Sequence, residues 1–198
     1  MSYFEPVSGS QAELIVKKSR FISFARKVTE RNQALTYAEE LKKRYPDSRH
    51  ICWGYMIGDP SNSTNAGCND DGEPSGTAGK PILTQINYSN VGNVVVCVVR
   101  YFGGIRLGAG GLVRAYRESA NLALAALKVS EFVPQQECVI TTTFEHENAV
   151  RQTLLNMNGE VIQCHYGRFV ELHVVLPIPH LDEVESTLKS YQSHLKRL

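Results

Sequence analysis

The sequence lacks a long apolar segment and a recognisable targeting segment. Its longest apolar run, Val94 to Val99, is far shorter than the roughly 20 residues that cross a bilayer. The N-terminus MSYFEPVSGSQAEL has no basic region followed by an apolar stretch, so it does not indicate a signal peptide. We therefore expect a cytoplasmic protein without a membrane-spanning helix.

Paired cysteine motifs are also missing. The five cysteines are odd in number and widely spaced, and no C-x-x-C motif occurs among Cys52, Cys68, Cys97, Cys138 and Cys164. This pattern excludes a disulfide framework and a zinc knuckle. A reducing compartment and no metal site are therefore predicted.

The sequence has little net charge, since the formal value is +1. The distribution is uneven: residues 1–127 contain 15 Lys/Arg and 11 Asp/Glu, whereas residues 128–198 contain 6 and 9. The positive excess of the first two thirds is compatible with an anionic partner, but it is far below that of a histone-like protein.

The first part of the chain mixes strand and helix patterns. Apolar patterning predicts strands over residues 12–16, 20–28, 50–57 and 93–102. Helices are predicted from Thr29 to about Tyr45, from Pro81 onward, and from Leu112 to about Val129. A long polar loop over residues 58–80 is typical of a functional or mobile segment.

A new pattern begins after Pro134, so the sequence predicts two domains, residues 1–133 and 134–198. Strands are expected over 138–144, 161–166 and 169–176, and helices over 145–157 and 181–191. This β-α-β-β-α order favours a ferredoxin-like domain in an α+β protein. Only residues 194–198 remain for its fourth strand, which must be very short or absent.

The segment NDDGEPSGTAGK carries an acidic motif made of Asp70, Asp71, Gly72, Glu73, Pro74 and Gly76. Clustered carboxylates bind hard cations or perform acid–base chemistry. Their spacing does not match an EF-hand, and Asp-Gly and Glu-Pro also set tight turns. The structural interpretation is favoured over metal binding. The following GTAGKP lacks the phosphate-loop spacing, which disfavours a Walker-type NTPase.

A glycine loop with nearby arginines precedes the helix predicted from Leu112. Free backbone N–H groups and the helix dipole at such a position favour anions, and guanidinium groups match phosphate geometry. There are two alternatives to an anion site. The glycines can merely serve tight turns, and Arg114 can form a surface ion pair with Glu118. The anion- or RNA-binding candidates are Arg100, Gly103, Gly104, Arg106, Gly108, Gly110, Gly111, Arg114 and Arg117.

Catalytic patterns are weak. His50 and Cys52 share one strand face, which permits a nucleophile–base pair but favours packed core residues. His165 and His173 are expected to face each other across a hairpin, as exposed histidines. Another basic group, from Lys17 to Lys27, is best explained as a solvated strand edge. No catalytic residue and no cofactor is predicted.

At NDDGEPSGTAGKPIL and VVVCVVRYFGGIRLGAGGLVRAYRESA the chain resembles the IMPACT family, in its bacterial YigZ-type branch. The resemblance covers about residues 10–128. It implies a first domain folded like domain IV of elongation factor G and a second like its ferredoxin-like domain V. Eukaryotic members bind a translational regulator, but they have an extra N-terminal domain. The family supplies no established catalytic residues.

The hypothesis from the sequence is a translation-associated protein that binds RNA or ribosome-associated proteins and is not an enzyme. One alternative is a phosphate-ligand enzyme or sensor that uses the glycine and acidic loops. The other is a protein-interaction module.

Overall fold

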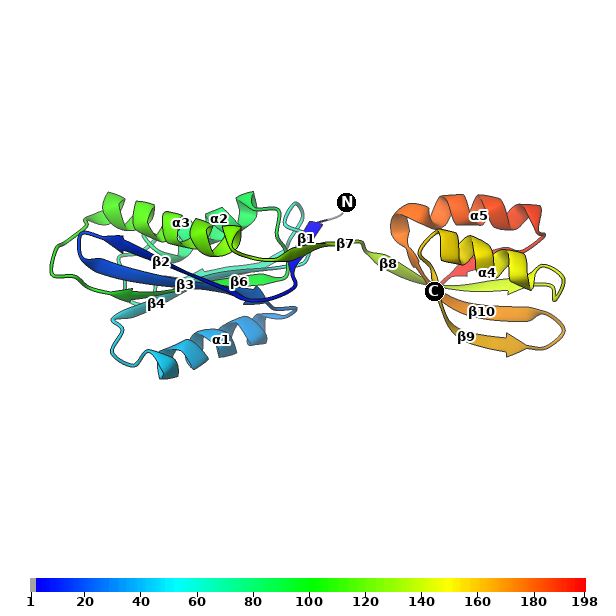
Figure 1. The fold of residues 1–198 in the computed structure, drawn as a ribbon, viewed down its shortest axis with the longest axis horizontal. Helices are drawn as coiled ribbons and strands as arrows, with labels where there is room; N and C mark the ends of the chain where they lie inside the picture. Colours follow the sequence, from blue (N-terminus) through cyan, green and yellow to red (C-terminus); the bar gives the residue numbers. More distant parts are fainter. Residues whose placement is uncertain (1–2) are drawn as a thin grey trace. The chain divides into compact units, whose positions relative to one another are not determined.

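The computed structural model describes residues 3–198 as an α+β protein of two compact units. Unit 1 ends at Phe132 and unit 2 begins at Val133. Each unit has its own sheet and its own helices (Figure 1). Among residues 3–198 no helix is long and apolar enough to cross a membrane.

A five-stranded antiparallel sheet forms the centre of unit 1. Its order is β2-β3-β6-β4-β5. The strands are β2 (Ser10–Val16), β3 (Ser19–Lys27), β4 (His50–Ile57), β5 (Asn65–Asn69) and β6 (Val94–Tyr101). The central position of β6 explains its unbroken apolar run, because both of its faces are covered.

Three helices cover the two faces of this sheet. Helix α1 (Arg31–Arg44) lies on one face, and α2 (Gly79–Tyr88) and α3 (Ala109–Ala125) lie on the other (Figure 1). Alternate residues of β6 divide between the two cores: Val94, Val96 and Val98 pack with α2 and α3, whereas Val95, Cys97 and Val99 pack with α1. Successive strand residues point to opposite faces, so one strand serves both cores.

Several predicted boundaries in unit 1 were wrong. Glu30, not Thr29, is the N-cap residue of α1, and the Thr29 N–H donates to Gln33 Oε1 at 2.9 Å. The long loop over 58–80 contains the edge strand β5, whose polar residues carry no apolar alternation. Helix α2 starts two residues before Pro81.

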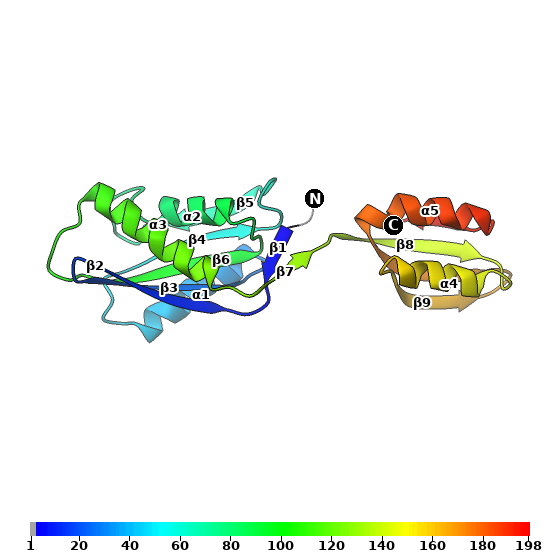
Figure 2. The same cartoon turned by 45° about the horizontal axis from the view of Figure 1, so that its top comes forward.

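The helix predicted from Leu112 to Val129 also has different ends. It begins at Ala109, inside the glycine loop, and ends at Ala125. Beyond it, β7 (Val129–Phe132) pairs antiparallel with β1 (Tyr3–Pro6), as Figure 2 shows. Neither strand was predicted, because the pairing joins segments far apart in the sequence and leaves no local signal.

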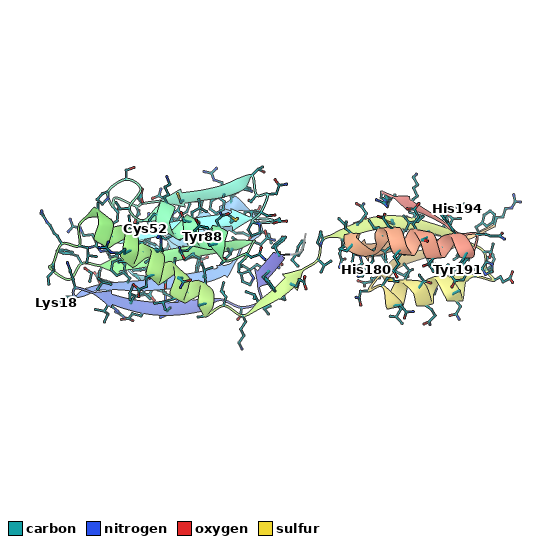
Figure 3. All side chains as sticks on the ribbon, turned by 90° about the horizontal axis from the view of Figure 1, so that it is seen from above. Lys18, Cys52, Tyr88, His180, Tyr191 and His194 are labelled. Carbon is teal, nitrogen blue, oxygen red and sulfur yellow. The ribbon has the colours of Figure 1, made fainter. Side chains whose placement is uncertain are left out.

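The hairpin between β2 and β3 turns at Lys17 and Lys18. Both have positive φ, 46° and 66°, and both are exposed. Figure 3 shows Lys18 at this tip. Two lysines therefore project at the end of the sheet where β6 also ends.

Unit 2 is a four-stranded antiparallel sheet covered by two helices. Its elements are β8 (Gln135–Thr142), α4 (Glu147–Asn156), β9 (Glu160–Tyr166), β10 (Val170–Pro177), a short 3₁₀ helix (Ile178–His180), α5 (Leu181–Ser190) and β11 (His194–Arg197). The strand order is β11-β8-β10-β9. A short fourth strand is thus present. The rings of His165 and His173 meet edge to face with centroids 5.7 Å apart; His165 is exposed and His173 is half-buried.

Candidate functional site

Two antiparallel strands bring positive side chains to one end of the unit 1 sheet. Strand β4 begins where β6 ends, and His50 lies opposite Arg100 in the register. The Arg49 N–H donates to the Arg100 carbonyl oxygen at 3.1 Å. Arg100 is therefore a neighbour of Arg49 and His50, although it lies about fifty residues away in the sequence.

Asp70 holds the acidic loop against the start of α2. Its carboxylate accepts the N–H groups of Gly76 (2.8 Å), Ala78 (3.0 Å) and Gly79 (2.8 Å). Burial alone would raise the pKa of Asp70, but the three backbone hydrogen bonds outweigh it and lower the pKa. This carboxylate supplies the cap that α2 lacks in its own N-cap residue, Ala78.

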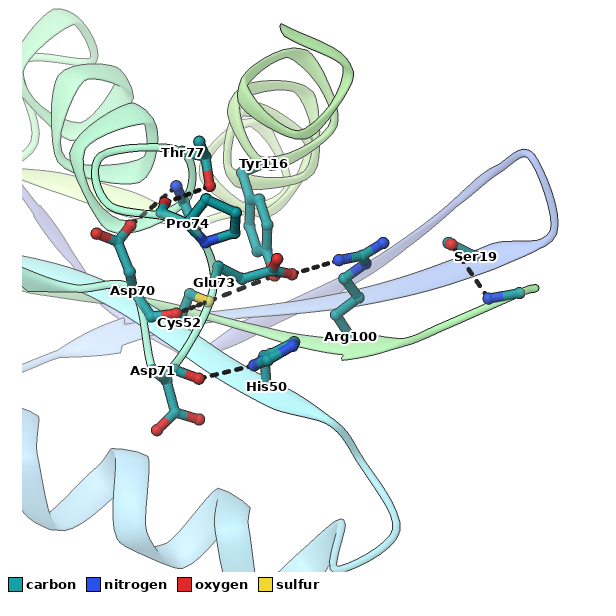
Figure 4. Close-up of polar contacts among 12 residues, drawn as sticks. Ser19, His50, Cys52, Asp70, Asp71, Glu73, Pro74, Thr77, Arg100 and Tyr116 are labelled. Carbon is teal, nitrogen blue, oxygen red and sulfur yellow. Dashed lines mark hydrogen bonds and ion pairs between the residues drawn. The ribbon is translucent and has the colours of Figure 1, made fainter. Parts of the chain in front are cut away.

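Asp71 ties the same loop to β4 and α1. One carboxylate oxygen accepts the Ile51 N–H at 2.7 Å, and the other lies 3.1 Å from Lys42 Nζ. The carbonyl oxygen of Asp71 is 2.7 Å from His50 Nδ1 (Figure 4). Because a carbonyl oxygen only accepts, Nδ1 of His50 is the donor in this hydrogen bond.

Glu73 points into the protein and pairs with Arg100. The Glu73 carboxylate lies 2.5 Å from Arg100 Nη1 and accepts the Tyr116 hydroxyl at 2.8 Å (Figure 4). The side chains of Glu73 and Arg100 are only 4% and 8% exposed. Burial and the neighbouring Cys52 and Glu73 raise the pKa of Tyr116, so it remains a neutral donor.

Cys52 is a packed core residue. Its Sγ lies 3.0 Å from the Asp70 carbonyl oxygen and 3.3 Å from the Tyr116 hydroxyl. Burial raises the pKa of the thiol, so the nucleophilic thiolate is disfavoured. This environment favours the structural interpretation of the His50–Cys52 pair.

The carboxylates of the acidic loop are thus held by protein donors. Asp70 accepts backbone N–H groups, Asp71 faces Lys42, and Glu73 faces Arg100. Across the described part of the chain, no three His, Cys, Asp or Glu side chains are grouped as ligands of a metal ion. The geometry supports a structural loop that positions Arg100.

The glycine loop after β6 packs against the β2–β3 hairpin. The Gly103 N–H donates to Ser19 Oγ at 3.2 Å, and a Cβ at Gly103 would overlap the Lys18 carbonyl group. Gly104 and Gly108 have φ of 84° and 73°, which favours glycine. Gly103 therefore permits close packing, and Gly104 and Gly108 permit the turns.

Helix α3 begins directly after this loop without a side-chain cap. Gly108 is its N-cap residue, and Gly110 and Gly111 lie in its first turn. The first N–H groups of a helix have no intrahelical acceptor and carry the positive end of the dipole. The start of α3 is therefore an open donor site.

These features meet around a pocket of about 480 Å³. One part of the lining is basic or polar, and the other is apolar. The lining residues are Arg49, His50, Glu73, Pro74, Arg100, Phe102, Arg106, Leu107, Gly108, Ala109 and Leu112. The pocket joins three guanidinium groups to the uncapped start of α3.

The arginines predicted around the glycine loop do not form one cluster. Arg100 and Arg106 line the pocket, whereas Arg114 and Arg117 line a separate hollow together with Gln85 of α2. No ion pair joins Arg114 to Glu118 in the region the structure covers. The chain therefore has two distinct arginine sites.

A family model described as the Impact N-terminal domain matches residues 17–124. A relative from Escherichia coli, "IMPACT family member YigZ", is 38% identical over 176 residues, which are 89% of this chain and 86% of that protein. The chain belongs to the IMPACT family. This confirms the resemblance seen in the two motifs.

Two further matches to this IMPACT family chain cover nearly its full length. An "IMPACT family member" from Haemophilus influenzae is 34% identical over 193 residues, 98% of this chain and 90% of that protein. A solved structure titled "Crystal structure of an hypothetical protein" has a TM-score of 0.71 at 33% identity and covers 100% of this chain and 97% of its own.

Five pocket residues of this IMPACT family chain were not predicted as site residues: Arg49, Phe102, Leu107, Ala109 and Leu112. Arg49 was not singled out, and Phe102 and Leu107 were treated as parts of a strand and a loop. Strands over 50–57 and 93–102 were predicted, and pairing them antiparallel would have placed Arg49 beside Arg100. The ends of the two predicted strands therefore contained the information that places Arg49 in the pocket. It was missed because these strands were not predicted to pair with each other.

Proposed function

We propose that this IMPACT family chain binds RNA of the translation machinery through the end of unit 1 that holds the pocket. The observation that carries the proposal is Arg100. Its guanidinium lines the pocket, its side chain is only 8% exposed, and its Nε has no hydrogen-bond partner. A buried donor without a partner is costly, and such an uncompensated polar group is typical of a functional site.

The charge of the pocket supports an anionic ligand. The lining contains three arginines, Arg49, Arg100 and Arg106, but one carboxylate, Glu73. The uncapped start of α3 adds backbone donors and the positive end of a helix dipole at Gly108 and Ala109. Guanidinium groups at a helix N-terminus are a chemical match for phosphate.

The surroundings of the pocket extend this positive surface. Lys17 and Lys18 form the exposed tip of the neighbouring hairpin, which packs against Gly103 (Figure 3). Arg20 is less available, because it forms an ion pair with Glu13 at 2.8 Å. A phosphate backbone that entered the pocket would therefore pass further cations.

Family membership supports the translational part of the proposal. The likeness of the two units to domains IV and V of elongation factor G stays a prediction, as does the ferredoxin-like assignment of unit 2. A protein that shares the fold of these elongation factor domains and binds phosphate in the pocket would act at the ribosome.

A small phosphorylated ligand is the second candidate. Pockets of about 300–1,000 Å³ are typical for such ligands, and this pocket measures about 480 Å³. Inorganic phosphate and adenosine monophosphate, added as competitors, would separate this candidate from RNA.

The test measures the affinity for fluorescein-labelled RNA at several salt concentrations. We expect linear loss of log affinity with log salt, with a slope of roughly −0.7 per phosphate contact for single strands. The double variant Arg49→Ala with Arg106→Ala should weaken binding to unrelated sequences about equally and flatten the slope by roughly 0.7 per lost contact.

The control is Arg117→Ala, since this exposed arginine of α3 lines the separate hollow. It should bind like the parent. All proteins must first show the same melting curve. Absence of salt-dependent binding to RNA or ribosomes would contradict the proposal and favour a protein-interaction module.

A further inference from the structure

We infer that the pocket accepts one unpaired nucleotide, with its base stacked on Phe102 and its phosphate at Arg100 and the start of α3. The inference rests on the proposed function and deepens it. It specifies single-stranded RNA, or an extruded base, as the ligand.

The lining of the pocket is divided into two chemical parts. Arg49, Arg100, Arg106 and the start of α3 form the part that suits phosphate. A second part is apolar and consists of Pro74, Phe102, Leu107 and Leu112, and the lining is completed by His50 and by Glu73, the partner of Arg100. A backbone phosphate alone would leave the apolar part unused, whereas a nucleotide has a charged and a planar apolar part.

Phe102 offers the surface on which a base would stack. The residue is 47% exposed, although it follows the buried strand β6. Exposed aromatic rings beside cations are the stacking platforms of proteins that bind single strands, because every base has a π-face. The exposed part of the Phe102 ring would therefore bind the base of a nucleotide, and the adjacent arginines would bind its phosphate.

Arg100 connects the two parts. Its guanidinium carbon lies 5.8 Å from the centre of the Phe102 ring and 5.5 Å from that of Phe21. Glu73 holds one terminal nitrogen, and Nε is unpartnered. A fixed guanidinium next to an aromatic ring places the phosphate donor close to the stacking surface.

The size of the pocket selects against a duplex. A volume of about 480 Å³ suits a ligand of nucleotide size, and the bases of an RNA duplex are stacked inside a helix whose deep groove side chains cannot read. A duplex would present phosphates to the rim but no base to Phe102.

The experiment compares a 12-nucleotide single strand that contains 2-aminopurine with its perfect duplex. We expect the single strand to bind at least tenfold more tightly at equal salt, and the 2-aminopurine fluorescence to fall as the base stacks. Phe102→Ala should weaken single-strand binding by about 5- to 150-fold and abolish the fluorescence change, with duplex affinity and the salt slope unchanged.

Two variants make the result specific. Phe102→Trp should keep affinity and quenching, because the ring is retained. Tyr88→Ala removes a ring that is 77% exposed in the same unit but outside the pocket, and it should change nothing. Melting curves identify any variant that is unfolded. If Phe102→Ala does not fold, the affinity and fluorescence change of Phe102→Trp are compared with those of the parent instead.

The outcomes separate the two proposals. If neither RNA binds in a salt-dependent way, the proposed function fails and this inference fails with it. If both RNAs bind but the duplex binds equally well, or Phe102→Ala binds like the parent, only the stacking inference is overturned.

Discussion

Arg100 illustrates how much of this site depends on single side chains. It ends the buried central strand β6, yet its guanidinium lines the pocket. Arg100 and Tyr116 come from two different elements and both donate to the same carboxylate oxygen of Glu73. The Glu73 carboxylate compensates the buried charge of Arg100. It also fixes the orientation in which the Arg100 guanidinium would meet the proposed ligand.

Replacing Glu73 with Gln should strongly destabilise unit 1. The change leaves the buried Arg100 charge without its partner, and breaking such a pair costs about 3–5 kcal/mol. Urea unfolding measured by circular dichroism gives the free energy of unfolding. Glu13→Gln breaks the exposed pair with Arg20 and serves as the control. A loss at Glu73 no larger than at Glu13 would contradict the buried-pair argument.

Helix α2 depends on a carboxylate that lies well before it in the sequence. Its own N-cap residue, Ala78, has no side chain that can accept a hydrogen bond. Asp70 accepts the N–H groups of Ala78 and Gly79 from the preceding loop. The acidic motif therefore caps the start of the helix and stabilises it.

The stabilisation from Asp70 should depend on pH. Its pKa is lowered in the folded protein, whereas an unfolded Asp has a pKa of about 3.9. The ionised group therefore stabilises the fold above about pH 4, and this contribution is lost as pH falls through the lowered folded pKa. Asp70→Asn should destabilise by about 1–2 kcal/mol at pH 7, and the difference from the parent should shrink below about pH 4.

The measurement is urea unfolding of parent and variant from pH 7 to pH 3. Asp47→Asn, at an exposed position before β4, is the control and should show no such trend. A difference at Asp70 that stays constant with pH would mean that the carboxylate charge does not hold the loop.

At the scale of the whole molecule, the chain has two sets of apolar cores. Unit 1 has a core on each side of its sheet, and unit 2 has one core between its sheet and its two helices. The division at Phe132 and Val133 falls between β7 and β8. Each unit therefore has the buried surface that independent folding requires.

Limited digestion with proteinase K should cut first within residues 132–136 or at the exposed residues Ser61, Asn62 and Thr64 before β5. Mass spectrometry of the early fragments identifies the sites, and circular dichroism tests whether each fragment keeps its structure. Exclusive cleavage inside Val94–Tyr101 would contradict this organisation, because that strand is buried on both faces.

Elements with strong local patterns were predictable. The strand over 50–57 was predicted with its observed ends, and the buried run from Val94 correctly indicated the central strand. Boundaries failed where glycine or polar residues obscured the pattern, at β5 and at the start of α3. The acidic and glycine motifs were found, but Arg49 and Phe102 entered the site only through strand pairing.

The sequence by itself determined the α+β class, the family and the two motifs, because apolar periodicity and motif spacing are local properties of the chain. Only the tertiary structure decided which arginines share a pocket. Arg49 and Arg100 are neighbours through antiparallel register, and Arg114 and Arg117 are separated from them by the rotation of α3. Such proximity depends on contacts between distant segments, which no local pattern records.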